Sequence, residues 1–340
     1  MSLFNQGCHG CGIVNVGNTC FMSAVLQCLA RIEPLRRALD VDRYNDRMSS
    51  TRFSRVLDEW NRIRGLLLVD SGSINPGRLI EAIQYTTKDS QIVFGQQNDA
   101  GEFLVCFLDL LHNALACKVE MKVCGMASSA KDGIAEQCYK AFRQEYESQF
   151  SPIVDIFNGI SIAGLCEVDK SPISGSLVPG MFNTLVLQIP GHNSKPTLTE
   201  CFRSHCEDEL LTGKNSWFDE SRDEKREVVR WTGFWSLPQV LVIEFKRRLF
   251  PPQRENRAVH TSLVNIDLSQ FIKGYGASSY VYDVKAICYH SGSATRGHYT
   301  AACNISGANW VFFNDEHKTR IDPTNLINGD ITLMFLVKQS

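Results

Sequence analysis

The sequence lacks the features that mark several classes of protein. No apolar run approaches the ~18 residues that a membrane-spanning helix needs, and residues 331–337, which include a threonine, form about the longest one. The N-terminus has no basic segment followed by an apolar stretch, so we expect no secretory signal. No internal repeat and no low-complexity segment is visible. We therefore expect neither a membrane protein nor a repeat protein.

An excess of charge of either sign is also missing. The 340 residues carry 35 Lys and Arg against 37 Asp and Glu, a formal net charge of −2, which argues against nucleic acid or a membrane surface as partner. The hydrophobic content of 44% is too high for a disordered chain. The thirteen cysteines are odd in number and scattered, which is typical of free thiols in a reducing compartment. We expect an intracellular protein, cytoplasmic or nuclear or both.

The apolar pattern changes near residue 150. Before it, apolar residues recur at the spacing of one helix face, in the stretches 22–29, 53–67 and 104–111. After it, short segments rich in β-branched and aromatic residues predict strands. These are 182–189, 240–245, 280–289, 298–305, 309–313 and 331–337, with polar, exposed excursions expected at 219–227 and 251–259. A helical part followed by an antiparallel part indicates an α+β fold with a cleft between the two.

One cysteine stands at a predicted helix start. Gly17 and Asn18 suit a tight turn, and Asn18 or Thr19 suits the N-cap. Cys20 then falls in the first helical turn, where unpaired N–H groups and the positive dipole end favour a thiolate. We therefore expect a lowered pKa and a reactive thiol at Cys20, whereas most other cysteines are typical of a protein core.

A thiolate nucleophile needs a base, and His298 is the best candidate among eight histidines. It opens the predicted strand 298–305, which a short loop joins to 309–313 as a hairpin. A three-residue loop would set His298 across from Asn314, and a two-residue loop would set it across from Asp315. Either side chain could accept the imidazole N–H and fix its tautomer, as in a Cys-His-Asn or Cys-His-Asp triad. The spacing does not decide between the registers, and Asn314-Asp315 is also typical of a polar turn after a buried strand.

Four segments, in order, resemble the ubiquitin-specific protease family of deubiquitinases. They are the box around Cys20 (residues 12–22), the Gln-Asn-Asp-Ala-Gly-Glu-Phe-Leu segment (97–104), the Leu-Pro-Gln strand (237–247), and the region from Tyr282 through 297–301 and 310–315 to Phe335. The resemblance implies a papain-like fold described as thumb, palm and fingers. It implies one catalytic domain over residues 1–340, with a helical thumb at about 1–150, palm and fingers at 151–340, and the fingers at about 155–235.

The resemblance also implies roles for individual residues. Cys20 would be the nucleophile, His298 the general base, and Asn314 the third member of the triad, with Asp315 as the alternative. Asn15 matches the position whose amide helps to stabilise the oxyanion.

A second set of residues would bind the tail of the modifier. Asp99 and Glu102 are candidate partners for the basic residues of ubiquitin's tail, and Gly297 and Tyr299 are candidate walls for its glycines. Asp99 followed by Glu102 is equally typical of a helix capping box.

The sequence departs from the family pattern in several places. Asn98 replaces a frequent Gln, and Arg248 stands where an aromatic residue usually follows Lys-Arg. The fingers of many members hold zinc with two Cys-x-x-Cys pairs, but here there is a lone Cys166 and no cysteine in 217–221. We therefore predict no metal in the fingers and packing by aromatic residues instead (Trp217, Trp231, Phe234 and Trp235). Cys8, His9 and Cys11 offer at most three ligands and no evident fourth.

The leading hypothesis is a thiol-dependent isopeptidase that removes ubiquitin, or a ubiquitin-like modifier, from lysine side chains. It needs no cofactor, its partners are the modifier and modified proteins, and it acts as a monomer. Two alternatives stay open: a catalytically silent ubiquitin-binding module with the same fold, and a zinc-dependent interaction protein that uses Cys8, His9 and Cys11.

Overall fold

The computed structural model describes residues 10–40, 52–69, 72–87, 92–173, 175–191, 193–248, 253–293 and 296–339. Helices dominate the part before residue 158 and strands dominate the rest, as the sequence predicts. The helices are α1 (Cys20–Leu29), α2 (Glu33–Ala38), α3 (Ser54–Leu67), α4 (Gly77–Thr86), α5 (Ala100–Leu115), α6 (Ala130–Tyr146), α7 (Pro152–Phe157) and α8 (Leu198–His205).

An eight-stranded sheet forms the centre of the stranded part. Its order is β15 (His317–Ile321), β14 (Asn309–Asn314), β13 (Gly297–Ser306), β12 (Val281–Gly292), β16 (Ile331–Lys338), β10 (Val240–Phe245) and β5 (Leu185–Leu187), with β11 (Ile266–Asp267) paired to β12. A four-stranded sheet joins β4 (Val178–Phe182), β3 (Gly159–Cys166), β9 (Val228–Ser236) and β6 (Glu209–Leu211). Two small pairs complete the topology: β1 (Gly12–Ile13) with β2 (Ser73–Ile74), and β7 (Trp217–Asp219) with β8 (Glu224–Arg226).

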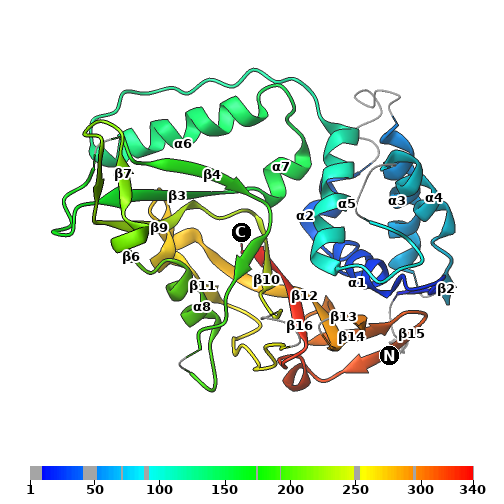
Figure 1. Ribbon diagram of the computed structural model, residues 1–340. Coiled ribbons are helices and arrows are strands. Elements are labelled where there is room, and N and C mark those ends of the chain that lie inside the picture. Colours follow the sequence, from blue (N-terminus) through cyan, green and yellow to red (C-terminus); the bar gives the residue numbers. More distant parts are fainter. Residues whose placement is uncertain are drawn as a thin grey trace, which may run out of the picture.

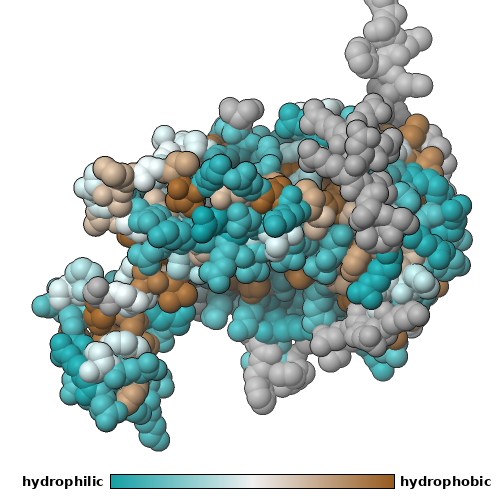
Figure 2. Space-filling view, turned by 90° about the horizontal axis from the view of Figure 1, so that it is seen from above, coloured by the Kyte–Doolittle hydropathy of each residue, from teal (hydrophilic) through white to brown (hydrophobic). Residues whose placement is uncertain are grey.

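Figure 1 shows how these parts are arranged. Helices α1 to α5 gather on the right, the large sheet lies below and beside them, and α6 runs along the top above β3 and β4. The strands of the small sheet extend to the left, away from the helices. Seen from above in Figure 2, the left side of the molecule projects as a lobe with both polar and apolar residues on its surface.

Helix α1 is the central element of the core. All ten of its residues are buried, so it presents no polar face to solvent. It packs against β12 and β13 on one side and against α5 on the other. This packing fixes the N-terminal end of α1, which carries Cys20, beside the start of β13, which carries His298.

Three of the expected segments differ in part from the structure. The predicted strand 182–189 is divided between β4 and β5, which belong to different sheets. The stretch 219–227 is largely exposed, as expected, but Asp219 is buried and bonds to Ser221 and Arg226 within the β7–β8 hairpin. In 251–259, Val259 is buried, and Arg254 turns inward toward backbone carbonyl groups. A charged side chain that is paired locally can be buried, which the sequence pattern does not reveal.

Within the part of the chain that is described, no helix combines the length and the apolar character needed to cross a membrane.

Candidate active site

The loop before α1 is organised by one amide side chain. Asn15 Oδ1 accepts hydrogen bonds from the backbone N–H groups of Gly17 and Thr19, both at 3.1 Å, and from the Thr19 hydroxyl at 3.2 Å. Gly17 and Asn18 have positive φ angles of 114° and 53°, which suit glycine and asparagine. Thr19 occupies the N-cap, although its side chain makes no cap bond. The predicted turn and helix start are confirmed.

Cys20 is the first residue of α1 and only 6% exposed. Burial raises the pKa of the thiol, and the nearby Asp315 carboxylate raises it further. The backbone N–H groups of Tyr299, Phe21 and Cys20 itself act in the opposite direction. The prediction of a lowered pKa is therefore wrong for this structure, because burial outweighs the helix terminus.

His298 and Asn314 lie in direct contact. Nε2 of the imidazole is 2.7 Å from the amide oxygen Oδ1 of Asn314. Since an amide oxygen can only accept, Nε2 carries the proton, and Nδ1 of the neutral ring is free to accept one. The arrangement is that of a base held in a defined tautomer by a neighbouring amide.

Neither predicted hairpin register is correct. The structure pairs Ala301 with Phe313 and Ala302 with Phe312, and a β-bulge lies between Asn304 and Ser306. This register sets neither Asn314 nor Asp315 directly across from His298. The contact is diagonal instead, and diagonal neighbours on one face of a sheet are within reach of long side chains.

Asp315 and Asn15 continue the polar network. Asp315 Oδ2 lies 3.8 Å from His298 Nε2 and accepts a hydrogen bond of 3.0 Å from Asn15 Nδ2. Its second oxygen, Oδ1, is buried and bonds to none of the described residues. Asn15 thus connects the loop before Cys20 to the turn after β14, and one of its two amide N–H groups is used in doing so.

The structure shows no hydrogen bond between Cys20 and His298 within the described chain. The His298 imidazole is turned toward Asn314. The Cys20 thiol lies against the backbone N–H of Tyr299, the residue that follows His298. The nucleophile and base candidates are therefore neighbours across the α1–β13 contact, but they are not yet aligned for proton transfer.

A cavity of about 320 Å³ opens at Cys20, and we call it the inner cavity. Gly297 and Tyr299 line it, as do three residues that the sequence did not nominate: Gln97, Arg248 and His290. The His290 and Tyr299 rings pack together with centroids 4.5 Å apart and planes tilted by 42°. Gln97 donates to the Gly297 carbonyl at 3.3 Å. A Cβ on Gly297 would lie 2.3 Å from His290 Nε2, so no side chain fits there.

Asp99 caps α5, as the sequence pattern predicts. Its Oδ1 accepts from the backbone N–H groups of Gly101 at 2.8 Å and Glu102 at 3.3 Å. Its Oδ2 accepts from Arg248 at 2.9 Å and from the Tyr299 hydroxyl at 3.3 Å. Glu102 is exposed and lines the same cavity. Both acids predicted to bind the tail therefore lie at the cleft, and Asp99 is already paired.

Among the described residues, no group of three or more His, Cys, Asp or Glu side chains is placed to hold a metal ion. Cys8 and His9 lie outside the described residues, so the structure does not bear on the Cys8, His9 and Cys11 hypothesis. The lone Cys166 is buried and faces the Val229 carbonyl.

A family model described as "Ubiquitin carboxyl-terminal hydrolase" matches residues 11–335. The chain is 29% identical to ubiquitin carboxyl-terminal hydrolase Usp2 of Drosophila melanogaster, over 96% of this chain and 34% of that protein. It is 27% identical to human ubiquitin carboxyl-terminal hydrolase 2, over 95% of this chain and 54% of that protein. The chain thus spans between about a third and a half of the length of these two relatives.

Solved structures show the same fold. A yeast SAGA DUB module with a mutant Sgf73 aligns with a TM-score of 0.72 and 19% identity, over 97% of this chain and 68% of that one. The SAGA DUB module Ubp8/Sgf11/Sus1/Sgf73 bound to monoubiquitin aligns with a TM-score of 0.70 and 20% identity, over 97% and 69%. The expected papain-like α+β fold is confirmed.

Proposed function

This chain belongs to the ubiquitin carboxyl-terminal hydrolase family, and from that premise we propose that it is a thiol-dependent deubiquitinase. Its substrate is the isopeptide bond between the C-terminal glycine of ubiquitin, or of a ubiquitin-like modifier, and a lysine side chain. The observation that carries the proposal is the 2.7 Å contact of His298 Nε2 with Asn314 Oδ1, beside a cysteine at a helix start. That set matches the chemistry of acyl transfer to sulfur.

The reaction proceeds in two steps. The Cys20 thiol gives its proton to His298 Nδ1 and attacks the glycine carbonyl, and His298 then protonates the departing lysine amine. Water, deprotonated by His298, hydrolyses the thioester and releases the modifier with a free carboxylate. Because the resting thiol has a raised pKa, the proton leaves only as His298 approaches it. Binding of the tail is therefore proposed to align the two side chains.

The oxyanion is proposed to bind near the N-terminus of α1. The backbone N–H groups of Cys20 and Phe21 already act on the sulfur, so they lie close to the carbonyl that it attacks. Asn15 adds the amide N–H that is not given to Asp315. Asn314 is the proposed third member of the triad, and Asp315 positions Asn15.

The modifier tail is proposed to lie in the inner cavity. Gly297, whose absent Cβ leaves the space that His290 Nε2 occupies, forms one wall of it, and the Gly-Gly terminus is proposed to lie against this wall. Tyr299 forms a wall, and Asp99 and Glu102 attract the basic residues of the tail.

The larger organisation follows from the same proposal. One catalytic domain comprises residues 1–340: a helical thumb up to about 150, then palm and fingers, with the fingers at about 155–235, where β3, β4 and β9 extend outward (Figure 1). It acts as a monomer on ubiquitinated proteins inside the cell, in the cytoplasm or nucleus, without a cofactor.

Two observations favour a second candidate, a silent ubiquitin-binding module. Cys20 and His298 are not hydrogen-bonded, and the pKa of the thiol is raised. Turnover of a fluorogenic ubiquitin C-terminal amide separates the two. A deubiquitinase hydrolyses it and loses the activity in Cys20→Ala and in His298→Ala. Measurable ubiquitin binding with no turnover by the folded wild-type protein would establish the silent module instead.

A further inference from the structure

A second and larger cavity adjoins the inner one. It has a volume of about 620 Å³ and lies between α5 and β10, and we call it the outer cavity. Asp99, Glu102, Arg248, His290 and Tyr299 line both cavities. A chain that reaches Cys20 from the outer cavity must therefore pass these residues.

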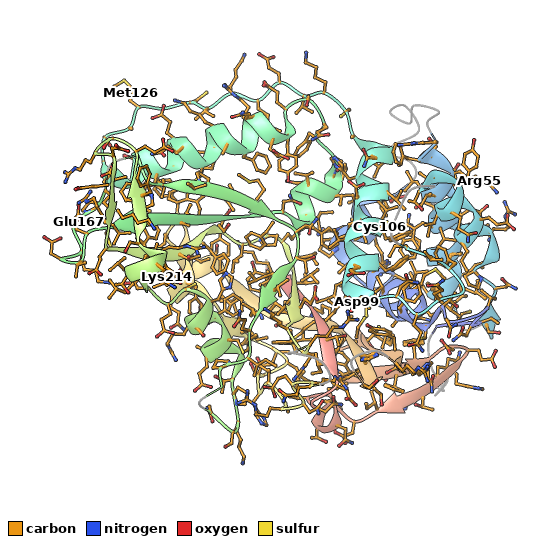
Figure 3. The ribbon with its side chains drawn as sticks, viewed as in Figure 1. Arg55, Asp99, Cys106, Met126, Glu167 and Lys214 are labelled. Atoms are coloured by element: carbon orange, nitrogen blue, oxygen red, sulfur yellow. The ribbon has the colours of Figure 1, made fainter. Side chains whose placement is uncertain are left out.

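An ion pair crosses this passage. Arg248 Nη2 lies 2.9 Å from Asp99 Oδ2, and the two residues are 149 positions apart in the sequence. Arg248 follows β10 in the stranded part. Asp99 is the N-cap of α5 in the helical part, where Figure 3 labels it. The pair thus joins the two walls of the cleft at the point where the outer and inner cavities meet.

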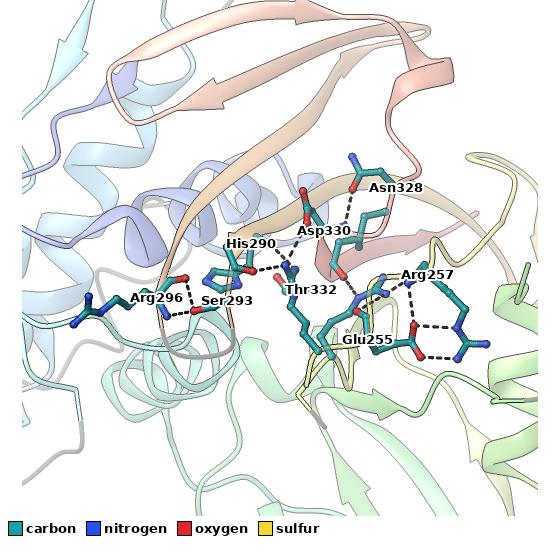
Figure 4. Close-up of polar contacts among 12 residues, drawn as sticks. Glu255, Arg257, His290, Ser293, Arg296, Asn328, Asp330 and Thr332 are labelled. Atoms are coloured by element: carbon teal, nitrogen blue, oxygen red, sulfur yellow. Dashed lines mark hydrogen bonds and ion pairs between the residues drawn. The ribbon is translucent and has the colours of Figure 1, made fainter. Parts of the chain in front are cut away.

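The side chains of Asp99 and Arg248 differ in exposure and in how firmly they are held. The Asp99 side chain is only 22% exposed and is fixed by its cap bonds, whereas the Arg248 side chain is 60% exposed. The Arg248 backbone is held by a bridge to Arg254, which in turn donates to the carbonyls of His290 and Gly292. Figure 4 shows the surrounding network, including the hydrogen bonds between Ser293 and Arg296 and the Glu255–Arg257 pair. The Arg248 side chain can therefore swing away without moving its backbone.

The charges at the junction of the two cavities favour a basic ligand once Arg248 has moved away, because Asp99 and Glu102 there are acidic. The outer cavity itself carries both signs: Glu244 and Asp109 lie with Lys246, Arg247 and Arg254, and the Glu244 carboxylate makes no hydrogen bond to the described residues. Glu244 Oε2 lies beside Gly101, 2.6 Å from where a Cβ would be. Arg248 gives its hydrogen bond to Asp99 and none to Glu244. Arg248 thus pairs with Asp99, the acid that is proposed to bind a basic residue of the modifier tail.

We propose that Arg248 is an autoinhibitory competitor that holds Asp99 in the free enzyme and is displaced by a basic side chain of the modifier tail. The inference rests on the proposed function, because that function supplies the basic tail. Tail binding replaces the Arg248–Asp99 ion pair by an ion pair between the tail and Asp99. The net free energy of tail binding is therefore less favourable than it would be without Arg248. Without Arg248, Asp99 is open and the tail binds more tightly.

The test is equilibrium binding of ubiquitin to the Cys20→Ala protein, with and without Arg248→Ala. We expect Arg248→Ala to lower Kd by about two- to fivefold, the range for a solvent-exposed ion pair. Lys246→Ala removes an exposed positive charge two residues away. It measures how far the loss of a positive charge by itself lowers Kd, and we expect this effect to be smaller than that of Arg248→Ala. Ubiquitin truncated before its basic tail residues should bind with the same Kd whether Arg248 is present or not.

Two further variants make the outcome decisive. Arg248→Gln should lower Kd as Arg248→Ala does. Agreement of the two variants shows that a folding defect of one of them does not cause the effect. In Asp99→Asn, which keeps an N-cap acceptor, Arg248→Ala should have no effect. A Kd that is unchanged by Arg248→Ala, or lowered equally by Lys246→Ala, overturns the proposal, as does an equal gain with truncated ubiquitin. Turnover by the wild-type enzyme tests the proposed function separately.

Discussion

The imidazole of His298 is held by Asn314 across a diagonal of the β13–β14 hairpin, with 2.7 Å between Nε2 and Oδ1. This contact places the proton on Nε2 and leaves Nδ1 as the basic nitrogen. A histidine without it could adopt either tautomer, and only one of them can accept the thiol proton. The orientation of the proposed base therefore depends on an amide on the neighbouring strand.

Asn314→Ala should lower kcat by about 10²-fold, the scale of a lost general-base contribution, with a smaller change in KM. Asn314→Asp keeps an oxygen that accepts from Nε2 and should retain more activity. The measurement is steady-state hydrolysis of a fluorogenic ubiquitin substrate across pH. Equal activity of Asn314→Ala and wild type would show that Asn314 does not orient the base.

Asp315→Asn should lower the pKa of Cys20, because the Asp315 carboxylate disfavours the thiolate. Iodoacetamide should then alkylate Cys20 severalfold faster at pH 8, with the midpoint of the pH profile moved downward. Peptide mapping by mass spectrometry follows the rate at Cys20, and the exposed Cys124 is the internal control. A slower or unchanged rate at Cys20 would contradict the electrostatic account.

Gly297→Ala should reduce activity strongly and destabilise the fold by ~1–3 kcal/mol, because the added methyl group meets His290 Nε2 and the Ser291 carbonyl. Gly133→Ala is the matched control, since nothing lies within 4 Å of a Cβ there. In helix α6 it should stabilise the protein by ~0.4–1 kcal/mol. Thermal and urea denaturation, together with turnover, distinguish the two variants. Full activity in Gly297→Ala would show that the packing of Gly297 against His290 does not shape the site.

Glu244 should make stability depend on pH. Burial, with the charges of Asp99 and Glu102, raises its pKa from 4.5 to about 7, and Arg248 opposes this. Between pH 4.5 and 7 the unfolded chain releases this proton and the folded chain keeps it, so stability falls as pH rises.

Glu244→Gln has no such titration. The free energy of unfolding of this variant should therefore rise relative to that of the wild type as the pH increases from 4.5 to 7. We expect a gain on the order of 2 kcal/mol, because solvent screens part of the cost at a half-buried carboxylate. Urea denaturation at a series of pH values measures the difference between the two proteins. A difference that stays constant from pH 4.5 to 7.5 would contradict the raised pKa.

The sequence predicts much of this arrangement, and the failures have physical causes. The spans of α1 and β10 follow from local composition and are confirmed. The register of β13 with β14 is wrong because the turn lies at residues 307–308, later than the sequence predicts, and because a bulge at Ile305 then shifts the pairs by one. His298 and Asn314 still meet, since both lie on one face of the hairpin.

The properties set by distant parts of the chain could not be predicted. The pKa of Cys20 depends on how deeply α1 is buried and on Asp315, and both are consequences of the fold. The pairing of Arg248 with Asp99 links two segments 149 residues apart. The sequence marked Arg248 as a departure from the family pattern, but only the structure shows which acid it meets.

The most direct test of the central claim is covalent capture of the nucleophile. A ubiquitin probe with a C-terminal electrophile, incubated with the folded protein, should add one ubiquitin, and mass spectrometry should find the adduct on Cys20. Cys20→Ala should remain unlabelled, and His298→Ala should label much more slowly. A folded wild-type protein that does not react with the probe, or reacts at another cysteine, would contradict the assignment of Cys20 as the nucleophile.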